Sequence, residues 1–327
     1  MDNTPVKRHN KWITFTVPVD WEGRTVREVL KGPLLLSNRM INRLTRMRGI
    51  RLNGRMPWLD RPVRAGDRLA VAIRPWEEPD LVPEPVPFGL VYEDDDLLVV
   101  DKPAGINVHP VRRHERGTLA HGIAYHWQQQ GVEARVRPVH RLDRDTSGLL
   151  LVAKHAYAHQ LLDRALREKR IRRVYLAVVH GRLAEGTGVI DAPIARDPGH
   201  PLRRRVDERG EPAVTRYRVL TQTDDASFVE AELETGRTHQ IRVHFAHLGH
   251  PLFGDRLYGA ATEHIARQAL HAARLAFTHP LTGAAMAFSS PLPEDLRHLV
   301  KTLGLAVPDD VLGVDAPARV PECGTFP

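Results

Sequence analysis

Apolar positions between residues 24 and 75 recur first at helical spacing and then at strand spacing. Two groups repeat every three or four residues, as in short amphipathic helices: Val26, Val29 and Leu30, then Met40, Ile41, Leu44 and Met47. Ser37 and Asn38 are suitable N-cap residues for the second helix. Alternating strands follow at residues 50–52, before a turn at Asn53 and Gly54, and within residues 63–73. The pattern predicts a small α/β domain over residues 1–76.

The pattern then changes to an acidic segment rich in proline. Residues 77–100 contain 8 acidic and no basic residues, and four prolines fall at positions 79, 83, 85 and 87. Proline-rich chain is extended and semi-rigid. We therefore expect residues 77–89 to be a linker that marks a domain boundary.

Strands and helices are interspersed in residues 90–303. Short apolar or alternating runs predict strands near residues 97–100, 149–153, 174–179, 213–220 and 228–233, and helices are expected near 118–130 and 156–170. This order is not a regular βαβ repeat and favours an α+β domain with a mixed sheet. The last segment, residues 304–327, is predicted to be a loosely ordered tail.

Charge narrows the class of partner. The chain has 47 Lys and Arg against 40 Asp and Glu, a formal net charge of +7. Residues 1–76 hold 16 basic and 6 acidic residues, so this segment alone carries a surplus of +10. A basic domain of this kind favours a polyanion such as RNA. Arg39, Arg43 and Arg46 on the second predicted helix are expected to bind phosphates, although a solvated helix face is the alternative interpretation.

Several classes of protein are disfavoured. The single cysteine, Cys323, excludes an intrachain disulfide framework, and no run approaches the length of an apolar membrane span. The first ten residues lack the apolar core of a signal peptide. No glycine-rich phosphate loop, dinucleotide fingerprint or paired-cysteine motif is present. We expect a cytoplasmic protein that needs no cofactor and does not bind a membrane.

The most informative polar block runs from His140 to Ser147 and leads directly into the apolar run at 149–153. Asp143 lies between Arg141 and Arg144, at the edge of a strand predicted to be buried on both faces. Such a carboxylate belongs either to an ion-pair network or to a site. A hydrolase triad of His140, Asp143 and Ser147 is disfavoured because the serine lacks the tight glycine turn of such nucleophiles.

A second block, residues 236–250, combines arginines with four histidines at positions 239, 244, 247 and 250. Metal binding is the sharper interpretation, but no zinc-protease spacing occurs, so structural or RNA-facing histidines are favoured. We expect an extended strand here. Arg237 and Arg242 would then point to opposite faces, and only one of them could reach a given site.

Tyr175 lies in the predicted strand 174–179, after a basic stretch that includes Arg173. A tyrosine in a strand is usually a core residue, but beside cationic side chains it could also stack on a base. Arg204, in a run of three arginines, adds a further basic loop. Both arginines are candidate RNA contacts.

In this order, residues 139–149, 173–177 and 236–242 resemble the three motifs of the RluA-type RNA pseudouridine synthases. Residues 99–105, 254–259 and 270–280 support the resemblance, which spans about residues 88–300. The segment before residue 76 resembles the small RNA-binding domain first defined in ribosomal protein S-four. The resemblance implies a catalytic domain with a mixed, largely antiparallel sheet.

The resemblance also implies an activity and a set of site residues. Uracil would be detached from one ribose of an RNA, rotated and rejoined through carbon. Asp143 would be the catalytic carboxylate, Arg242 its ion-pair partner and Tyr175 the residue that stacks on the base. Arg141 would fill the space that the flipped nucleotide leaves.

Ribosomal RNA of the large subunit is the favoured substrate of this predicted monomer, and transfer RNA is the alternative. A non-catalytic RNA-binding factor and a metal hydrolase are the competing hypotheses.

Overall fold

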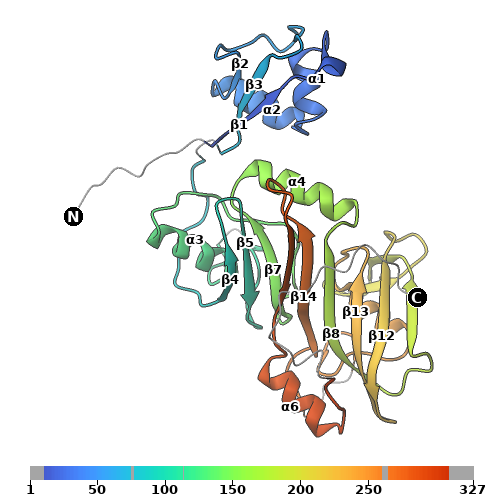
Figure 1. The fold of residues 1–327 in the computed structure, drawn as a ribbon. Helices are drawn as coiled ribbons and strands as arrows, with labels where there is room; N and C mark the ends of the chain where they lie inside the picture. Colours follow the sequence, from blue (N-terminus) through green and yellow to red (C-terminus); the bar gives the residue numbers. More distant parts are fainter. Residues whose placement is uncertain (1–10, 75–76, 113, 260–263, 309–327) are drawn as a thin grey trace.

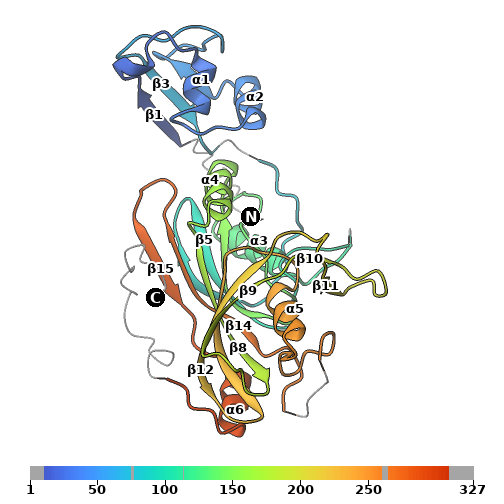
Figure 2. The ribbon, with the colours of Figure 1, turned by 90° about the vertical axis from the view of Figure 1, so that its right-hand side faces the viewer.

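The computed structural model describes residues 11–74, 77–112, 114–259 and 264–308. It contains a small three-stranded sheet with two helices, and a ten-stranded sheet with four (Figures 1 and 2). We call these parts the small domain and the large domain. Within the described residues, no helix has the length and apolarity needed to cross a membrane.

The small domain is built from the predicted helices and strands plus one further strand. Its helices are α1 (Val26–Lys31) and α2 (Asn38–Arg46), and its sheet has the order β1 (Trp12–Thr16), β3 (Arg68–Ala72), β2 (Ile50–Leu52), all antiparallel. The Ser37 side chain caps α2 by accepting a hydrogen bond from the Met40 amide. The apolar faces of both helices are buried against the sheet. A 3-10 turn, η1 (Val19–Trp21), links β1 to the helices.

The large sheet has the order β4-β5-β7-β14-β8-β13-β12-β9, with β15 paired to β14 and β6 to β7. The strands are β4 (Gly89–Glu93), β5 (Leu97–Lys102), β6 (Arg137–Pro138), β7 (Ser147–Ala153), β8 (Arg172–His180), β9 (Thr187–Asp191), β12 (Val214–Gln222), β13 (Ala226–Leu233), β14 (Leu270–Thr278) and β15 (Ala285–Ser289). The pairing of β7 with β14 is parallel, and the other named pairs are antiparallel. A short antiparallel ribbon, β10 (Ile194–Arg196) with β11 (Arg204–Val206), lies beside this sheet.

Glycine is required where β7 meets β14. Gly148 has a φ of +108° and pairs with Ala272, and a Cβ at residue 148 would lie 2.3 Å from the carbonyl oxygen of Ala272. A larger residue would therefore push the two strands apart.

Helices cover both faces of the large sheet. On one face, α3 (Leu119–Gln129) and α5 (Gln240–His247) pack against residues of β5, β7, β8 and β13 in the largest core cluster. On the other face, α4 (Ala156–Arg167) and α6 (Glu294–Thr302) pack in two further clusters. This explains why all seven residues of β7 are buried, as its continuous apolar pattern predicts.

The small domain contacts the large domain through α4, which lies between the two in Figure 1. The Tyr157 hydroxyl donates to the carbonyl of Leu34 at 2.9 Å, and its ring joins the small domain's core. The Ser37 amide donates to the Gln160 side chain at 2.8 Å. A residue of the large domain thus completes the apolar core of the small one.

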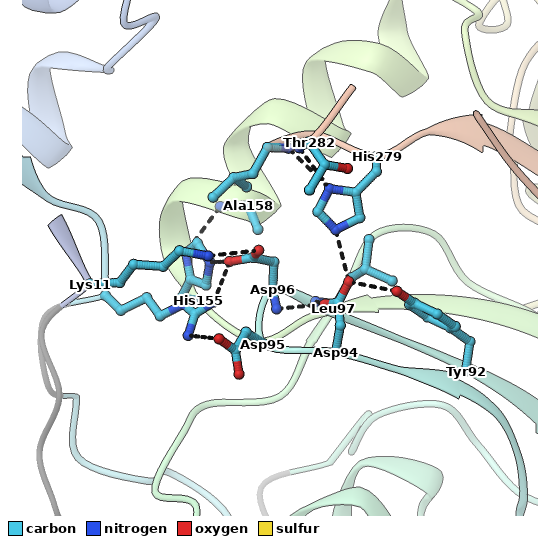
Figure 3. Close-up of polar contacts among 12 residues, drawn as sticks. Lys11, Tyr92, Asp94, Asp95, Asp96, Leu97, His155, Ala158, His279 and Thr282 are labelled. Carbon is cyan, nitrogen blue, oxygen red and sulfur yellow. Dashed lines mark hydrogen bonds and ion pairs between the residues drawn. The ribbon is translucent and has the colours of Figure 1, made fainter. Parts of the chain in front are cut away.

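Buried charges add to this contact. The carboxylate of Asp96 accepts from Lys11 at 3.3 Å, from Arg74 at 2.6 Å and from His155 at 3.0 Å (Figure 3). Burial would raise the pKa of Asp96, but the His155 and Arg74 partners lower it overall. Glu77 makes ion pairs with Arg43 of α2 and with Arg137 of β6. The segment after residue 76 therefore joins the two domains as well as linking them in sequence.

The α+β class and the largely antiparallel sheet are confirmed. The predicted strands correspond to β2, β3, β5, β7, β8, β12 and β13. The other strands of the described residues are not predicted from the sequence; they are β1, β4, β6, β9, β10, β11, β14 and β15. Leu305 is buried with α6, and the rest of the predicted tail after residue 308, with Cys323, lies outside the described residues.

Candidate active site

Asp143 lies on a turn immediately before β7, and its carbonyl accepts a hydrogen bond from the Thr146 amide at 3.1 Å. Lys102, at the end of β5, connects this turn by hydrogen bonds to the loop that follows β5. Its fully buried ammonium donates to the carbonyls of Pro103 (2.8 Å), Ile106 (3.0 Å) and Arg144 (2.9 Å). Burial lowers the pKa of Lys102 to about 8. The backbone that carries Asp143 is thus held in one position.

Arg242 on α5 bridges two carboxylates. Its Nη1 donates to Oδ2 of Asp143 at 3.0 Å, while Nε and Nη2 donate to the two oxygens of Asp255 at 2.7 and 2.8 Å. Burial alone would lower the pKa of Arg242, but the hydrogen bonds and charges of Asp255 and Asp143 raise it overall. A guanidinium that stays charged stabilises the negative charge of Asp143.

Asp143 borders a cavity of about 50 Å³. Tyr175, on β8, reaches this cavity from the sheet and is 4% exposed, and burial raises the pKa of its hydroxyl. Arg141 is exposed and also borders the cavity. The complete lining is Arg141, Leu142, Asp143, Thr146, Tyr175, Leu233, Arg237, His239, Gln240, Ile241, Arg242 and Leu270. Three segments far apart in the chain thus bring together the predicted carboxylate, arginines and tyrosine.

The prediction of an extended strand across residues 237–244 was wrong. Residues from Gln240 onward form α5, and Arg237 lies in the loop before it. Both Arg237 and Arg242 therefore border the same cavity, instead of pointing to opposite faces. Buried Gln240, Arg242 and His244 hide the helical pattern, because their polar groups are satisfied by tertiary partners.

The predicted RNA contacts differ in accessibility. Arg39 and Arg46 are exposed on α2, whereas Arg43 is paired with Glu77. Arg204, on β11, is partly exposed. Arg173 is only 6% exposed, and its Nη2 donates to the carbonyls of Leu233 and Thr235. The Arg173 guanidinium is thus turned into the fold and already bonded there, so its contact with RNA stays a prediction that the exposure of this side chain does not support.

The hydrolase triad is not assembled. His140 is buried, accepts from the Leu151 amide at 3.3 Å and has its pKa lowered to about 3 by burial. Ser147 instead hydrogen-bonds His271 at 2.9 Å.

The histidines after residue 239 do not converge on a metal site. His244 bonds Thr215 and the Ala192 carbonyl, and His250 bonds the His180 carbonyl. In the part of the chain that the structure describes, the group with metal-ligand spacing is Asp94, Asp96 and His279. Its carboxylates are already occupied by the neighbouring cations and hydroxyl of Figure 3.

The sequence matches two models of known protein families. Residues 96–247 match the family model described as RNA pseudouridylate synthase, and residues 13–69 match the model of the RluD ribosomal pseudouridine synthase N-terminal domain. An RNA pseudouridine synthase of Bacillus subtilis (strain 168), YhcT, is 42% identical over 283 residues, which cover 86% of this chain and 94% of that protein.

The chain belongs to the RNA pseudouridylate synthase family. It is an enzyme that isomerises uridine in RNA to pseudouridine.

Other members of the pseudouridylate synthase family match over most of the chain. Ribosomal large subunit pseudouridine synthase D of Neisseria meningitidis serogroup B is 40% identical over 310 residues, or 90% of this chain and 82% of that protein. The solved structure of human RNA Pseudouridylate Synthase Domain Containing 1 has a TM-score of 0.54 and 28% identity, covering 68% of this chain and 97% of that one. Human RNA Pseudouridylate Synthase Domain Containing 4, at 24% identity and a TM-score of 0.56, shares the fold over 67% of this chain and 94% of that one.

The candidate site also contains residues to which the sequence analysis gives no role. Asp255 is fully buried behind Arg242, and the Tyr258 ring lies 5.1 Å from the Arg242 guanidinium. Both belong to residues 254–259, which the family resemblance includes without a role. Lys102 carries a weak signal of its own, since it belongs to a charged pair, Asp101 and Lys102, that directly follows an apolar run.

Proposed function

We propose that Asp143 is the catalytic carboxylate of this pseudouridine synthase and that its target lies in large-subunit ribosomal RNA. The observation that carries the first part is the hydrogen bond from Arg242 to Asp143 at the edge of a cavity that Tyr175 and Arg141 also border. Asp143 keeps 17% of its side chain exposed, whereas Asp255 is completely enclosed. Of the two carboxylates bound to Arg242, only Asp143 can therefore meet a substrate.

The isomerisation needs a carboxylate that is ionised. The bond between uracil N1 and the ribose C1′ breaks, the base turns, C5 bonds to C1′, and the proton lost from C5 is balanced by one gained at N1. An aspartate can assist either by attacking the nucleotide or by accepting a proton from the ribose, and both roles require the charged form. Arg242 supports this form, since its guanidinium remains positive while it donates to Asp143.

Arg141 and Tyr175 suit the two requirements of a base that must leave an RNA stack: the gap it leaves must be filled, and the flipped base must be held. The target base must leave its stack to reach a carboxylate at the edge of the cavity, and an exposed arginine beside it can occupy the gap. Tyr175 offers an aromatic face for stacking. Because burial raises the pKa of Tyr175, its hydroxyl stays protonated and can donate a hydrogen bond during the reaction.

Large-subunit ribosomal RNA is favoured over transfer RNA by the relatives. The Neisseria protein is named for the ribosomal large subunit, and the small domain matches a family model named for a ribosomal pseudouridine synthase. The exposed Arg39 and Arg46 on α2 provide the positive charge for a phosphate contact.

The test compares Asp143→Asn with Asp145→Asn in a strain from which the gene has been deleted. Asp145 is a matched control, because it lies on the same turn and its side chain is 45% exposed. We expect Asp145→Asn to restore the missing pseudouridines and Asp143→Asn to restore none, while both bind RNA within about twofold of the wild type, since one neutralised carboxylate removes no phosphate contact.

Two outcomes would contradict the proposal. Pseudouridine formation by Asp143→Asn would remove Asp143 from the reaction. Loss of pseudouridines from transfer RNA alone, mapped in the deletion strain, would instead overturn the ribosomal assignment.

A further inference from the structure

His239 is held in an unusual conformation at the edge of the cavity. It directly precedes α5 with φ 60° and ψ 20°, in the left-handed region that residues other than glycine rarely adopt. Backbone strain of this kind persists where the surrounding contacts hold it, and such residues cluster at functional sites. The His239 side chain is 16% exposed and borders the cavity.

The hydrogen bonds of Tyr258 determine which ring nitrogen of His239 carries the proton. The Tyr258 hydroxyl accepts from the Arg204 amide at 2.7 Å and lies 2.8 Å from Nδ1 of His239. Nδ1 is the acceptor available for the phenolic proton, so Tyr258 donates to it. Burial raises the pKa of Tyr258 and lowers the pKa of His239, which keeps the phenol protonated and the imidazole neutral. The ring proton of His239 is then on Nε2.

Asp143 favours the same tautomer independently. Its Oδ1 lies 4.0 Å from Nε2 of His239, and a negative oxygen attracts an N–H group and repels a nitrogen lone pair. The separation is too long for a hydrogen bond, so the Nε2–H donor remains available. Tyr258 fixes the ring as well, since the two rings meet edge to face at 5.6 Å.

We infer that His239 is a further substrate-contacting residue, whose Nε2–H donates a hydrogen bond to an acceptor oxygen of the target uridine. Tyr258 is the positioning residue that orients this donor. The inference rests on the proposed function, because it requires the uridine to enter the cavity beside Asp143. The inference also connects the basic β10–β11 ribbon with the site, because the backbone amide of Arg204 in that ribbon donates to the Tyr258 hydroxyl.

Two substitutions of His239 separate its two nitrogens. The amide nitrogen of glutamine can reach the position of Nε2, whereas asparagine ends near Nδ1. Single-turnover rates would be measured on ribosomal RNA from the deletion strain, together with the affinity for that RNA. We expect His239→Gln to react about tenfold faster than His239→Asn, which is the effect of one retained hydrogen bond, with equal RNA affinity.

A purely structural role predicts the opposite order, because asparagine tolerates the left-handed backbone better than glutamine. An Asn variant as fast as the Gln variant, or faster, would therefore overturn the inference.

A second measurement does not depend on turnover by the variants. Nitrogen-15 NMR of the wild-type enzyme should show His239 as the Nε2–H tautomer, assigned by its absence in His239→Gln. Tyr258→Phe should lower the share of this tautomer, because only the charge of Asp143 then favours it. An Nδ1–H tautomer in the wild type would refute the inference. Pseudouridine formation by Asp143→Asn would count against the proposed function instead, since the tautomer is measured without RNA.

Discussion

Replacing Asp255 with asparagine should destabilise the large domain far more than the same change at Asp143. Both carboxylates bind Arg242, but Asp255 is fully buried and accepts two hydrogen bonds from it, whereas Asp143 accepts one and is partly exposed. Arg242 itself is 8% exposed. In Asp255→Asn this enclosed cation loses its principal partner. In Asp143→Asn it keeps both hydrogen bonds to Asp255.

The expected magnitudes follow from these contacts. Removing one partner of a buried ion pair costs about 3–5 kcal/mol, because the remaining charge is left without compensation. Losing one partly solvated hydrogen bond costs about 1 kcal/mol. In a domain of roughly 150–250 residues, each kcal/mol lowers Tm by about 2–4 °C. Asp255→Asn should therefore lower Tm by about 6–20 °C, and Asp143→Asn by about 2–4 °C.

Thermal unfolding followed by circular dichroism, at one pH and salt concentration, measures both variants against the wild type. Activity is measured at a temperature below the unfolding transition of the less stable variant, so that both variants are folded when they are compared. If Asp143→Asn lowers Tm as much as Asp255→Asn, the two carboxylates are structurally equivalent and the reasoning fails. It fails equally if Asp255→Asn unfolds within about 4 °C of the wild type, the shift expected for a single hydrogen bond.

Three further perturbations test other parts of the molecule. Replacing both Arg39 and Arg46 with alanine should weaken RNA binding and reduce the slope of log K against log salt by about 2, one for each phosphate contact. The control is Arg43→Ala, which should change this slope less, because the Arg43 guanidinium already pairs with Glu77. Burial lowers the pKa of Lys102 from its ordinary value of 10.5 to about 8 in the folded protein, so the unfolded chain binds more protons between these pH values and stability rises with pH. Urea unfolding should show a gain of up to about 3 kcal/mol over this range that Lys102→Met lacks, and parallel curves for the two proteins would exclude it. Glu77→Gln should release both of its arginines and speed protease cleavage within residues 77–89 severalfold, whereas Glu78→Gln, at an exposed position, should not.

The fold was predictable where local pattern and tertiary environment agree. The continuous apolar run of β7 is buried on both faces, and α1 and α2 bury the apolar positions that their spacing indicates. Prediction of the element type from the sequence failed at α5, whose buried residues include Gln240, Arg242 and His244. These polar side chains are buried because distant residues satisfy them, and no local pattern encodes such partners.

The site was predictable in part for the same reason. Asp143, Tyr175 and Arg242 stand in recognisable motifs, and the cavity brings them together. Asp255 and Lys102 act through contacts that appear only in three dimensions. Asp255 accepts two hydrogen bonds from the Arg242 guanidinium, and Lys102 donates to three carbonyl oxygens. Hydrogen bonds to backbone carbonyls leave no trace in side-chain patterning.

The position of β14 bears on when this enzyme becomes active during its own synthesis. In the sheet, β14 lies between β7, which follows Asp143, and β8, which carries Tyr175, although it comes after both in the chain. A nascent chain that has been translated through α5 contains all three motifs but lacks β14, the strand that lies between β7 and β8 in the finished sheet, so we expect the motifs to stay apart at that stage. Domains generally form as their chain is completed. A translation product that ends before residue 270 would keep the family's motif residues and have no active site.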